Sequence, residues 1–275
     1  MKLKLLITGL ALLVSALPSW AGGIVMMGGG VAASAPAATN WLEDASLVSY
    51  YQFESGALTT DYKSNTTLVN GSGTPTANTT DFVESAASAN FSRSGTDLVY
   101  VTPYASCAAN FPTIGTGDGE VTVAMWVRIT TAGAYHVLSL KNTGAEGTVL
   151  AIRFDASNYP TVLADGSGEV TATSTAALTT NTWALVALSY SDTSNTLAVY
   201  VRSAGEGSST WTTATADIGT LDDIGGTSGI FVLGGSANDE AFYGQLDAVA
   251  VFNGKALTQS ELDGVFTNGW DGDGW

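Results

Sequence analysis

The sequence contains a single cysteine, Cys107, and a single histidine, His136, among 275 residues. One thiol excludes an internal disulfide, so folding must depend on a buried core. We expect Cys107 to be a buried thiol, with an intermolecular bridge as the alternative. His136 falls on a predicted strand with no evident nucleophile partner, which favours a structural role over catalysis.

Basic residues are also scarce, with nine lysines and arginines against 25 aspartates and glutamates. Two of the nine, Lys2 and Lys4, precede an apolar run and are predicted to be removed with it. Such an acidic chain excludes nucleic acid as a partner. A solvated acidic surface is one interpretation of the acidity, and calcium binding is another.

Long hydrophobic runs are absent after the N-terminus. Residues 1–21 combine the two lysines with the apolar run Leu5–Leu17 and small residues around Trp20, which is typical of a secretory signal. No later stretch approaches the ~20 apolar residues that cross a membrane. We therefore predict a secreted protein, extracellular or at the cell surface, without a transmembrane anchor.

The segments that flank the main domain have biased compositions. Residues 22–45 form a Gly/Ala-rich leader or linker around the apolar Ile24–Met27. Residues 22–40 are a candidate for self-association, because an apolar strand can add to the sheet edge of a neighbouring molecule. Residues 269–275, with Trp270 and Trp275 around two aspartates, form an aromatic and acidic tail.

Between these segments the chain alternates short apolar runs with clusters of Gly, Ser, Thr, Asn and Asp, which predicts an all-β fold. The predicted strands are Leu47–Phe53, Val121–Ile129, His136–Leu140, Val149–Phe154, Trp183–Tyr190, Leu197–Arg202 and Ile230–Leu233. Val121–Ile129 alternates apolar residues strictly, so one face of that strand must lie in a core. A polar loop at Ser191–Asn195 joins two strands into a hairpin.

The stretch FYGQLDAVAVFNGKALTQSELDGVF, residues 242–266, changes from a strand pattern to a helical one. Its strand, Phe242–Phe252, places Phe242, Leu246, Ala248, Ala250 and Phe252 on one predicted face, and Tyr243, Val249 and Val251 on the other. Asp247 lies within this apolar strand, where an unpaired carboxylate is unfavourable. Thr258 and Glu261 form a predicted capping box for a helix that ends near Asn268, and Leu257 can pack on Leu262.

These runs resemble the laminin-G-like, concanavalin A-like family of LamG and pentraxin-type modules. The resemblance covers residues 46–268 and is carried by VSYYQFES at 48–55, EVTVAMWVRI at 120–129, NTWALVALSYSDTSNTLAVYV at 181–201, GIFVLGG at 229–235 and the closing stretch. It implies a two-sheet antiparallel jelly-roll sandwich with one short C-terminal helix, whose first and last strands are neighbours. Ala248 replaces the family's usual glutamate after the closing aspartate, and Arg202-Ser203 replace its usual glycine.

Calcium is the cofactor that the resemblance implies. Asp247, together with Asp61 and Asn65 of an early loop, matches the positions that carry the metal in the family. The alternative is that the Asp247 carboxylate accepts backbone or side-chain hydrogen bonds without a metal.

Binding fits the sequence better than catalysis. The glucanases of this fold carry paired carboxylates on one strand, and no such spacing exists here. Sugar recognition needs exposed aromatic side chains beside polar loops, and the candidates are Tyr104, Tyr135, Tyr159, Trp211 and Tyr243. We therefore predict a non-catalytic module that binds glycans or other extracellular ligands in adhesion or surface attachment. The alternatives are a structural subunit of an extracellular assembly and a glycosidase.

Overall fold

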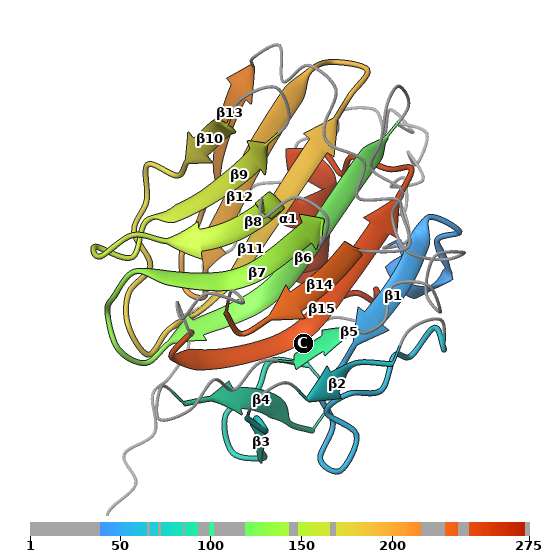
Figure 1. Cartoon of the computed structure of the whole chain (residues 1–275), viewed down its shortest axis with the longest axis vertical. Helices are drawn as coiled ribbons and strands as arrows, with labels where there is room; N and C mark the ends of the chain where they lie inside the picture. The colour runs from blue at the N-terminus through green and yellow to red at the C-terminus, as the bar shows by residue number, and fades with distance from the viewer. Residues whose placement is uncertain are drawn as a thin grey trace, which may run out of the picture. The chain divides into compact units, whose positions relative to one another are not determined.

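The computed structural model describes residues 39–272, except 65–66, 71–72, 85, 93–98, 102–118, 143–147, 166–168, 216–228 and 236–241. This part of the chain forms two antiparallel β-sheets and one α-helix near its C-terminal end, as predicted (Figure 1). The predicted signal, residues 22–38 of the leader and Cys107 lie outside the described residues. Among the described residues, no helix is long and apolar enough to cross a membrane.

One sheet has eight strands in the described part, in the order β13-β12-β11-β6-β15-β4-β3, with β1 also paired to β15. Its strands are β1 (Leu47–Tyr51), β3 (Thr76–Asn78), β4 (Ser88–Phe91), β6 (Glu120–Ile129), β11 (Trp183–Ser191), β12 (Thr196–Ser203), β13 (Thr210–Thr215) and β15 (Gly244–Asn253). The antiparallel pairing of β1 with β15 confirms that the first and last strands are neighbours.

The other sheet has seven strands in the described part, in the order β10-β9-β8-β7-β14-β5-β2. Its strands are β2 (Val69–Asn70), β5 (Val99–Val101), β7 (Tyr135–Asn142), β8 (Thr148–Phe154), β9 (Pro160–Asp165), β10 (Glu169–Thr173) and β14 (Gly229–Leu233). Each of the seven runs predicted as strands before residue 240 overlaps an observed strand. Strands β2–β5, β9, β10 and β13 were not predicted.

The main core lies between the two sheets. Val123 and Met125 of β6 pack in one cluster with Leu150 and Ile152 of β8, and all four side chains are buried. Strict alternation along β6 sends these residues inward and Ala124 to the opposite face. The apolar alternation in the sequence thus assigns the inner face of this strand correctly.

A second apolar cluster covers the outer face of the eight-stranded sheet. Helix α1 (Gln259–Asn268) packs Leu262 and Val265 into this cluster together with Ala124, Ala187 and Ala250. Small alanine side chains on the sheet leave room for the helix to approach. Thr258 caps α1 through the predicted capping box, and Leu257 and Leu262 are both buried in the cluster.

A β-bulge corrects the predicted faces of the last strand. Strand β15 begins at Gly244, and its register with β6 shifts between Asp247 and Ala250. Ala248 takes a φ of 48°, which reverses the alternation from that point. Phe242 and Leu246 therefore face the core between the sheets with Val249 and Val251, whereas Ala248, Ala250 and Phe252 face the outer cluster. The predicted grouping of Phe242 and Leu246 with Ala250 was wrong.

Two tryptophans join the chain ends of the described domain. The N–H of Trp41, in the 3-10 helix η1 (Trp41–Glu43), donates to the carbonyl of Trp270 at 2.8 Å. Both indoles are buried in the outer cluster, and Phe252 contacts each of them. The packed domain thus includes Trp41, which the sequence placed in the leader, and Trp270, which it placed in the tail.

Candidate functional site

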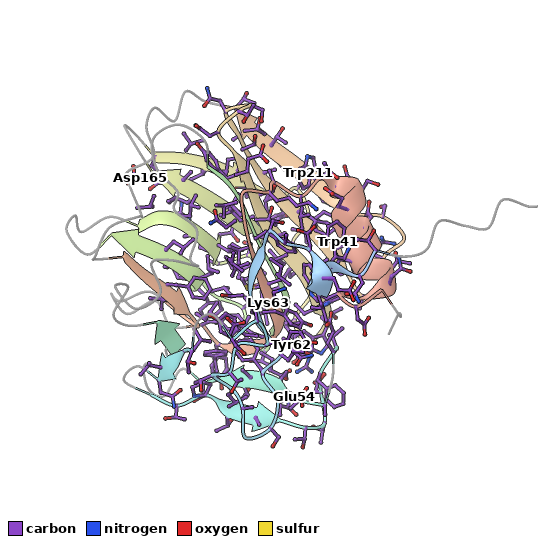
Figure 2. All side chains as sticks on the ribbon, turned by 90° about the vertical axis from the view of Figure 1, so that its right-hand side faces the viewer. Trp41, Glu54, Tyr62, Lys63, Asp165 and Trp211 are labelled. Atoms are coloured by element: carbon purple, nitrogen blue, oxygen red, sulfur yellow. The ribbon has the colours of Figure 1, made fainter. Side chains whose placement is uncertain are left out.

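In the described part of the chain, pockets lie near both ends of helix α1 on the outer face of the eight-stranded sheet. Figure 2 shows Trp211 on the side of the sandwich that holds the helix, and Asp165 of β9 on the opposite side. We call the first the Trp211 pocket; its volume is about 340 Å³. Its lining consists of Glu120, Ser189, Ser191, Ser194, Thr196, Ala198, Trp211, Ala256, Leu257, Thr258 and Gln259.

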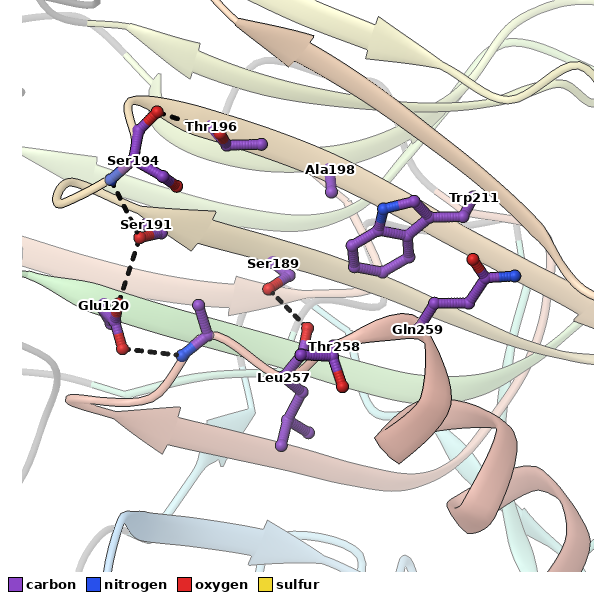
Figure 3. A pocket seen from close by; sticks show the side chains of 11 residues that line it. Glu120, Ser189, Ser191, Ser194, Thr196, Ala198, Trp211, Leu257, Thr258 and Gln259 are labelled. Carbon is purple, nitrogen blue, oxygen red and sulfur yellow. Dashed lines mark hydrogen bonds between the residues drawn. The ribbon is translucent and has the colours of Figure 1, made fainter.

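Strand register explains why polar side chains line this pocket. Ser189 and Ser191 of β11 stand opposite Ala198 and Thr196 of β12. The same period of two that buries the alternate residues of both strands sends these four to the outer face. Helix α1 covers the middle of that face, so the polar end stays open and forms the pocket floor (Figure 3).

Buried hydroxyls fix the far wall of the pocket, the segment 255–258. Ser189 Oγ donates to the carbonyl of Leu257 at 2.9 Å. Thr122 Oγ1 donates to the carbonyl of Lys255 at 3.0 Å and accepts the N–H of Leu257 at 2.8 Å. These three hydrogen bonds hold the start of α1 against the sheet, so the pocket is largely preformed.

Trp211 and Glu120 supply the distinctive chemistry. The half-buried indole of Trp211 lies beside Ala198 and near Gln259, and it meets the ring of Tyr200 edge-on, with centroids 6.3 Å apart (Figure 3). Glu120 Oε1 accepts from Ser191 Oγ at 3.1 Å, and its Oε2 accepts the N–H of Ala256 at 3.4 Å. The pocket therefore combines an indole with hydroxyl, amide and carboxylate groups.

The second pocket, which we call the aromatic groove, has a volume of about 550 Å³. Its lining consists of Phe82, Val83, Trp126, Trp183, Arg202, Ala204, Gly205, Phe266 and Thr267. Trp126 is almost fully buried, Trp183 and Phe266 are half-buried, and the Phe82 side chain is 39% exposed. The described lining of the groove thus presents several rings and a single charged side chain, Arg202.

Two aspartates hold the loop wall of the aromatic groove. Asp81 accepts from Trp183 Nε1 at 2.9 Å and pairs with Arg128 Nη1 at 2.9 Å. Asp247 Oδ2 accepts the N–H groups of Val83 at 2.7 Å and of Glu84 at 2.9 Å. The closing aspartate therefore joins β15 to the loop at 81–84, and backbone donors supply the hydrogen bonds that were the alternative to a metal.

Two buried acids behind this wall have raised pKa values. Burial raises the pKa of Asp247 to about 7, although the N–H groups of Glu84 and Val83 act in the opposite direction. Burial also raises the pKa of Glu84 to about 8, against the hydrogen bond that the Tyr50 hydroxyl donates to it. The charge of Asp247 raises the pKa of Glu84 further. Both acids therefore hold their protons close to neutral pH.

The two predicted metal ligands that the structure describes, Asp61 and Asp247, accept hydrogen bonds from different segments of the chain. Asp61 Oδ1 accepts the N–H of Tyr50 at 2.8 Å and of Lys63 at 3.0 Å, whereas Asp247 is bound by the loop at 81–84. Among the described residues, no three His, Cys, Asp or Glu side chains are grouped to hold a metal. Asn65 lies outside the described residues. Calcium binding by Asp247, Asp61 and Asn65 stays a prediction.

The predicted aromatic candidates separate in the structure. Trp211 lines a pocket, while Tyr135 is 2% exposed in the main core and donates its hydroxyl to the carbonyl of Thr131. Tyr159 and Tyr243 are half-buried and line neither pocket. Tyr104 lies outside the described residues.

Sequence reasoning missed the aromatic groove. Trp126 and Trp183 fell in runs predicted as strands, and neither they nor Phe82 and Arg202 were singled out as binding residues. A signal was available, because Trp183 and Arg202 alternate with the buried residues Ala184 and Val201 and so face outward. The loop that brings Phe82 beside them carries no comparable pattern.

Comparisons with known proteins agree with this fold. The family model Laminin G 3, described as the concanavalin A-like lectin/glucanases superfamily, matches residues 100–263, more than half of the chain. No curated protein matches the sequence.

Solved structures with low sequence identity share the fold. Domain 4 of AbnA, a GH43 extracellular arabinanase from Geobacillus stearothermophilus solved with arabinotriose, has a TM-score of 0.56 at 17% identity, covering 80% of this chain and 98% of that one. The botulinum neurotoxin serotype D/C binding domain has a TM-score of 0.55 at 14% identity, covering 80% and 51%. Trypanosoma rangeli sialidase has a TM-score of 0.52 at 18% identity, covering 81% and 33%. This chain thus spans only about half or less of the last two. With the family match over residues 100–263, the chain belongs to the concanavalin A-like lectin/glucanases superfamily.

Proposed function

We propose that this chain is an exported, non-catalytic carbohydrate-binding module that takes a saccharide in the Trp211 pocket. The observation that carries the proposal is the combination of one indole with hydroxyl, amide and carboxylate groups in a pocket of about 340 Å³. An indole face suits the C–H surface of a sugar ring, and the polar groups suit its hydroxyls.

Fold relatives make this proposal reasonable. The arabinanase domain, which this chain covers almost completely, is described in complex with arabinotriose, and a related botulinum neurotoxin type C structure is described as interacting with two ganglioside molecules. A glycosidase is the weaker alternative, because retaining or inverting hydrolysis needs two carboxylates facing one cleft. Glu120 is the only carboxylate among the described residues that line the two pockets.

A glycan array probed with the mature chain identifies a ligand, and calorimetry with that ligand tests the site. We expect Trp211→Ala to weaken binding at least tenfold, and Trp211→Phe to weaken it less because a ring face remains. Tyr62→Ala is the matched control, since Tyr62 is 57% exposed and lines neither pocket. Unchanged affinity of Trp211→Ala would remove the pocket from the proposal.

Two further outcomes would favour the other predictions. Ordered polymers of the mature chain in negative-stain micrographs, with no glycan bound on the array, would indicate a structural subunit. Release of reducing sugar from a bound glycan, abolished by one carboxylate substitution, would indicate a glycosidase. Binding by a monomer without hydrolysis is the result that we expect, and it would fit a role in adhesion or surface attachment.

A further inference from the structure

The aromatic groove has features of a second ligand site that the Trp211 pocket does not share. Its floor and walls come from three separate parts of the chain: Trp126 and Trp183 from the sheet, Phe266 from α1, and Phe82 from the loop at 81–84. Phe82 is one of the few large apolar side chains that the described residues leave exposed. Rings gathered at an open surface are suited to stacking against a flat ligand.

Arg202 carries the charge of the groove. Its guanidinium carbon lies 4.2 Å from the centroid of the Phe266 ring, and its Nη1 donates to Asp263 Oδ1 at 3.2 Å. The Nε–H is buried and has no hydrogen-bond partner within the described part of the chain. Because Nε is closed to solvent, a ligand can meet the guanidinium only through the exposed 17% of the Arg202 side chain, which lines the groove.

Arg202 is the one charged side chain in the described lining of the groove, and its ion-pair partner Asp263 lies outside that lining. Asp263 is shared, because it also accepts from Tyr200 Oη at 2.9 Å and from Ser209 Oγ at 3.3 Å. No carboxylate belongs to the lining that the described residues give the groove. In a chain with 25 acidic and nine basic residues, an arginine among aromatic rings is a local exception to the surrounding negative charge.

The wall of the groove is fixed in advance of any ligand. Asp81 and Asp247 anchor the loop that carries Phe82 and Val83 through hydrogen bonds of 2.7–2.9 Å. The guanidinium is held in place by Phe266 and Asp263. A ligand that enters the groove therefore meets an ordered site and loses little affinity to loop ordering.

We propose that the aromatic groove is a second binding site, which takes a saccharide ring bearing a carboxylate, with the ring against Phe82 and Trp183 and the carboxylate on the guanidinium of Arg202. Planar guanidinium and carboxylate groups form paired, charge-assisted hydrogen bonds, and these strengthen in apolar surroundings. The proposal does not depend on the Trp211 pocket, which lies at the other end of α1 and has a different lining.

The test uses the mature chain with a uronic acid trisaccharide and its carboxyl-reduced neutral counterpart, each titrated by calorimetry at low salt. We expect the acidic trisaccharide to bind at least tenfold more tightly than the neutral one, with affinity that falls as salt rises. Arg202→Gln should abolish this preference. Equal binding of the two trisaccharides, or preference retained in Arg202→Gln, would overturn the proposal.

Two substitutions at exposed positions locate the ligand without disturbing the core. Ala204 is exposed at the rim, so Ala204→Tyr should block the groove, and Phe82→Ala should remove one stacking surface. Tyr62→Ala, at an exposed residue that lines neither pocket, should leave binding of the acidic trisaccharide unchanged. Unimpaired binding by Ala204→Tyr, or binding of a sulfated sugar without the uronate, would contradict the assignment.

Discussion

Asp247 and Val83 lie 164 residues apart in the chain but are joined by a hydrogen bond of 2.7 Å from the N–H of Val83 to Oδ2 of Asp247. Glu84 donates its N–H to the same oxygen at 2.9 Å. Because Asp247 is fully buried beside the bulge in β15, the last strand and the loop wall of the aromatic groove form one packed unit.

Removing this carboxylate should destabilise the domain. Asp247→Ala leaves two backbone donors without their acceptor, which lowers the free energy of unfolding by about 2–5 kcal/mol. Asp247→Asn keeps one acceptor oxygen and should cost less. Urea unfolding measures both, with Asp155→Ala as the control.

Asp155 is a matched control because its Oδ1 also accepts two backbone N–H groups, from Ser157 at 2.8 Å and Tyr159 at 2.9 Å, but in an exposed loop. Water can replace the lost acceptor there, so we expect a loss below about 1 kcal/mol. If Asp155→Ala and Asp247→Ala lowered the free energy of unfolding equally, burial of Asp247 would not explain the effect of its removal.

The raised pKa values of Asp247 and Glu84 predict a stability that falls as pH rises. The pKa of Asp247 is about 7 against an ordinary value of 3.8, and the pKa of Glu84 is about 8 against 4.5. The folded chain therefore binds more protons than the unfolded chain between about pH 4 and pH 8, and stability is lost through that window, on the order of a few kcal/mol.

Melting temperature recorded from pH 4 to pH 8 measures this effect. Glu84→Gln should flatten the profile, because glutamine cannot ionise yet still accepts from the Tyr50 hydroxyl. Glu169→Gln, at a 52% exposed side chain paired with Arg153, should leave it unchanged. A wild-type melting temperature that rises steadily from pH 4 to pH 8 would contradict the predicted effect of the raised pKa values of Asp247 and Glu84.

The fold was predictable where side-chain pattern alone determines an element. Val121–Ile129 alternates strictly, and Thr258 with Glu261 marks the start of α1, so both were placed correctly. Strand β13 was not predictable, because its sequence TWTTAT has no apolar alternation and its pairing with β12 defines it. The bulge at Ala248 could not be predicted either, because alanine rarely adopts a positive φ and so gives no signal of one.

The sequence indicated individual residues of the candidate sites but not which residues meet there. Trp211 was one of five aromatic candidates for sugar binding, proposed together because each lies in or beside a predicted loop, and it lines a pocket. Its companions Ser189 and Gln259 come from distant parts of the chain and meet through strand register and helix packing. Asp247 was conspicuous as a carboxylate in an apolar strand, but its partners Val83 and Glu84 contribute backbone N–H groups, which any sequence provides.

Two glycines should respond oppositely to alanine. A Cβ at Gly244 would lie within 3.0 Å of the backbone oxygen of Arg128 and of the Phe242 ring, and the backbone of the central strand pair cannot move aside. We expect Gly244→Ala to lower the free energy of unfolding by more than about 3 kcal/mol.

Gly264 lies in the interior of α1, and a Cβ added there would meet nothing within 4 Å. Gly264→Ala should therefore raise the free energy of unfolding by about 0.5–1 kcal/mol, because alanine favours the helix. Urea unfolding compares the two variants directly. A destabilised Gly264→Ala would indicate that α1 packs more tightly than the structure shows.

The cap of α1 should contribute measurably to stability because the helix closes the outer cluster. Thr258 Oγ1 accepts the N–H of Glu261 at 3.3 Å, and Glu261 Oε2 accepts the N–H of Thr258 at 2.8 Å. Thr258→Ala removes the first of these hydrogen bonds and should lower the free energy of unfolding by about 1 kcal/mol. Thr258→Ser keeps the hydroxyl and should change it by only a few tenths. Chemical unfolding of the two variants separates the effect of the hydrogen bond from that of the lost methyl group. If both variants lowered the free energy of unfolding equally, the hydroxyl would not be the stabilising group.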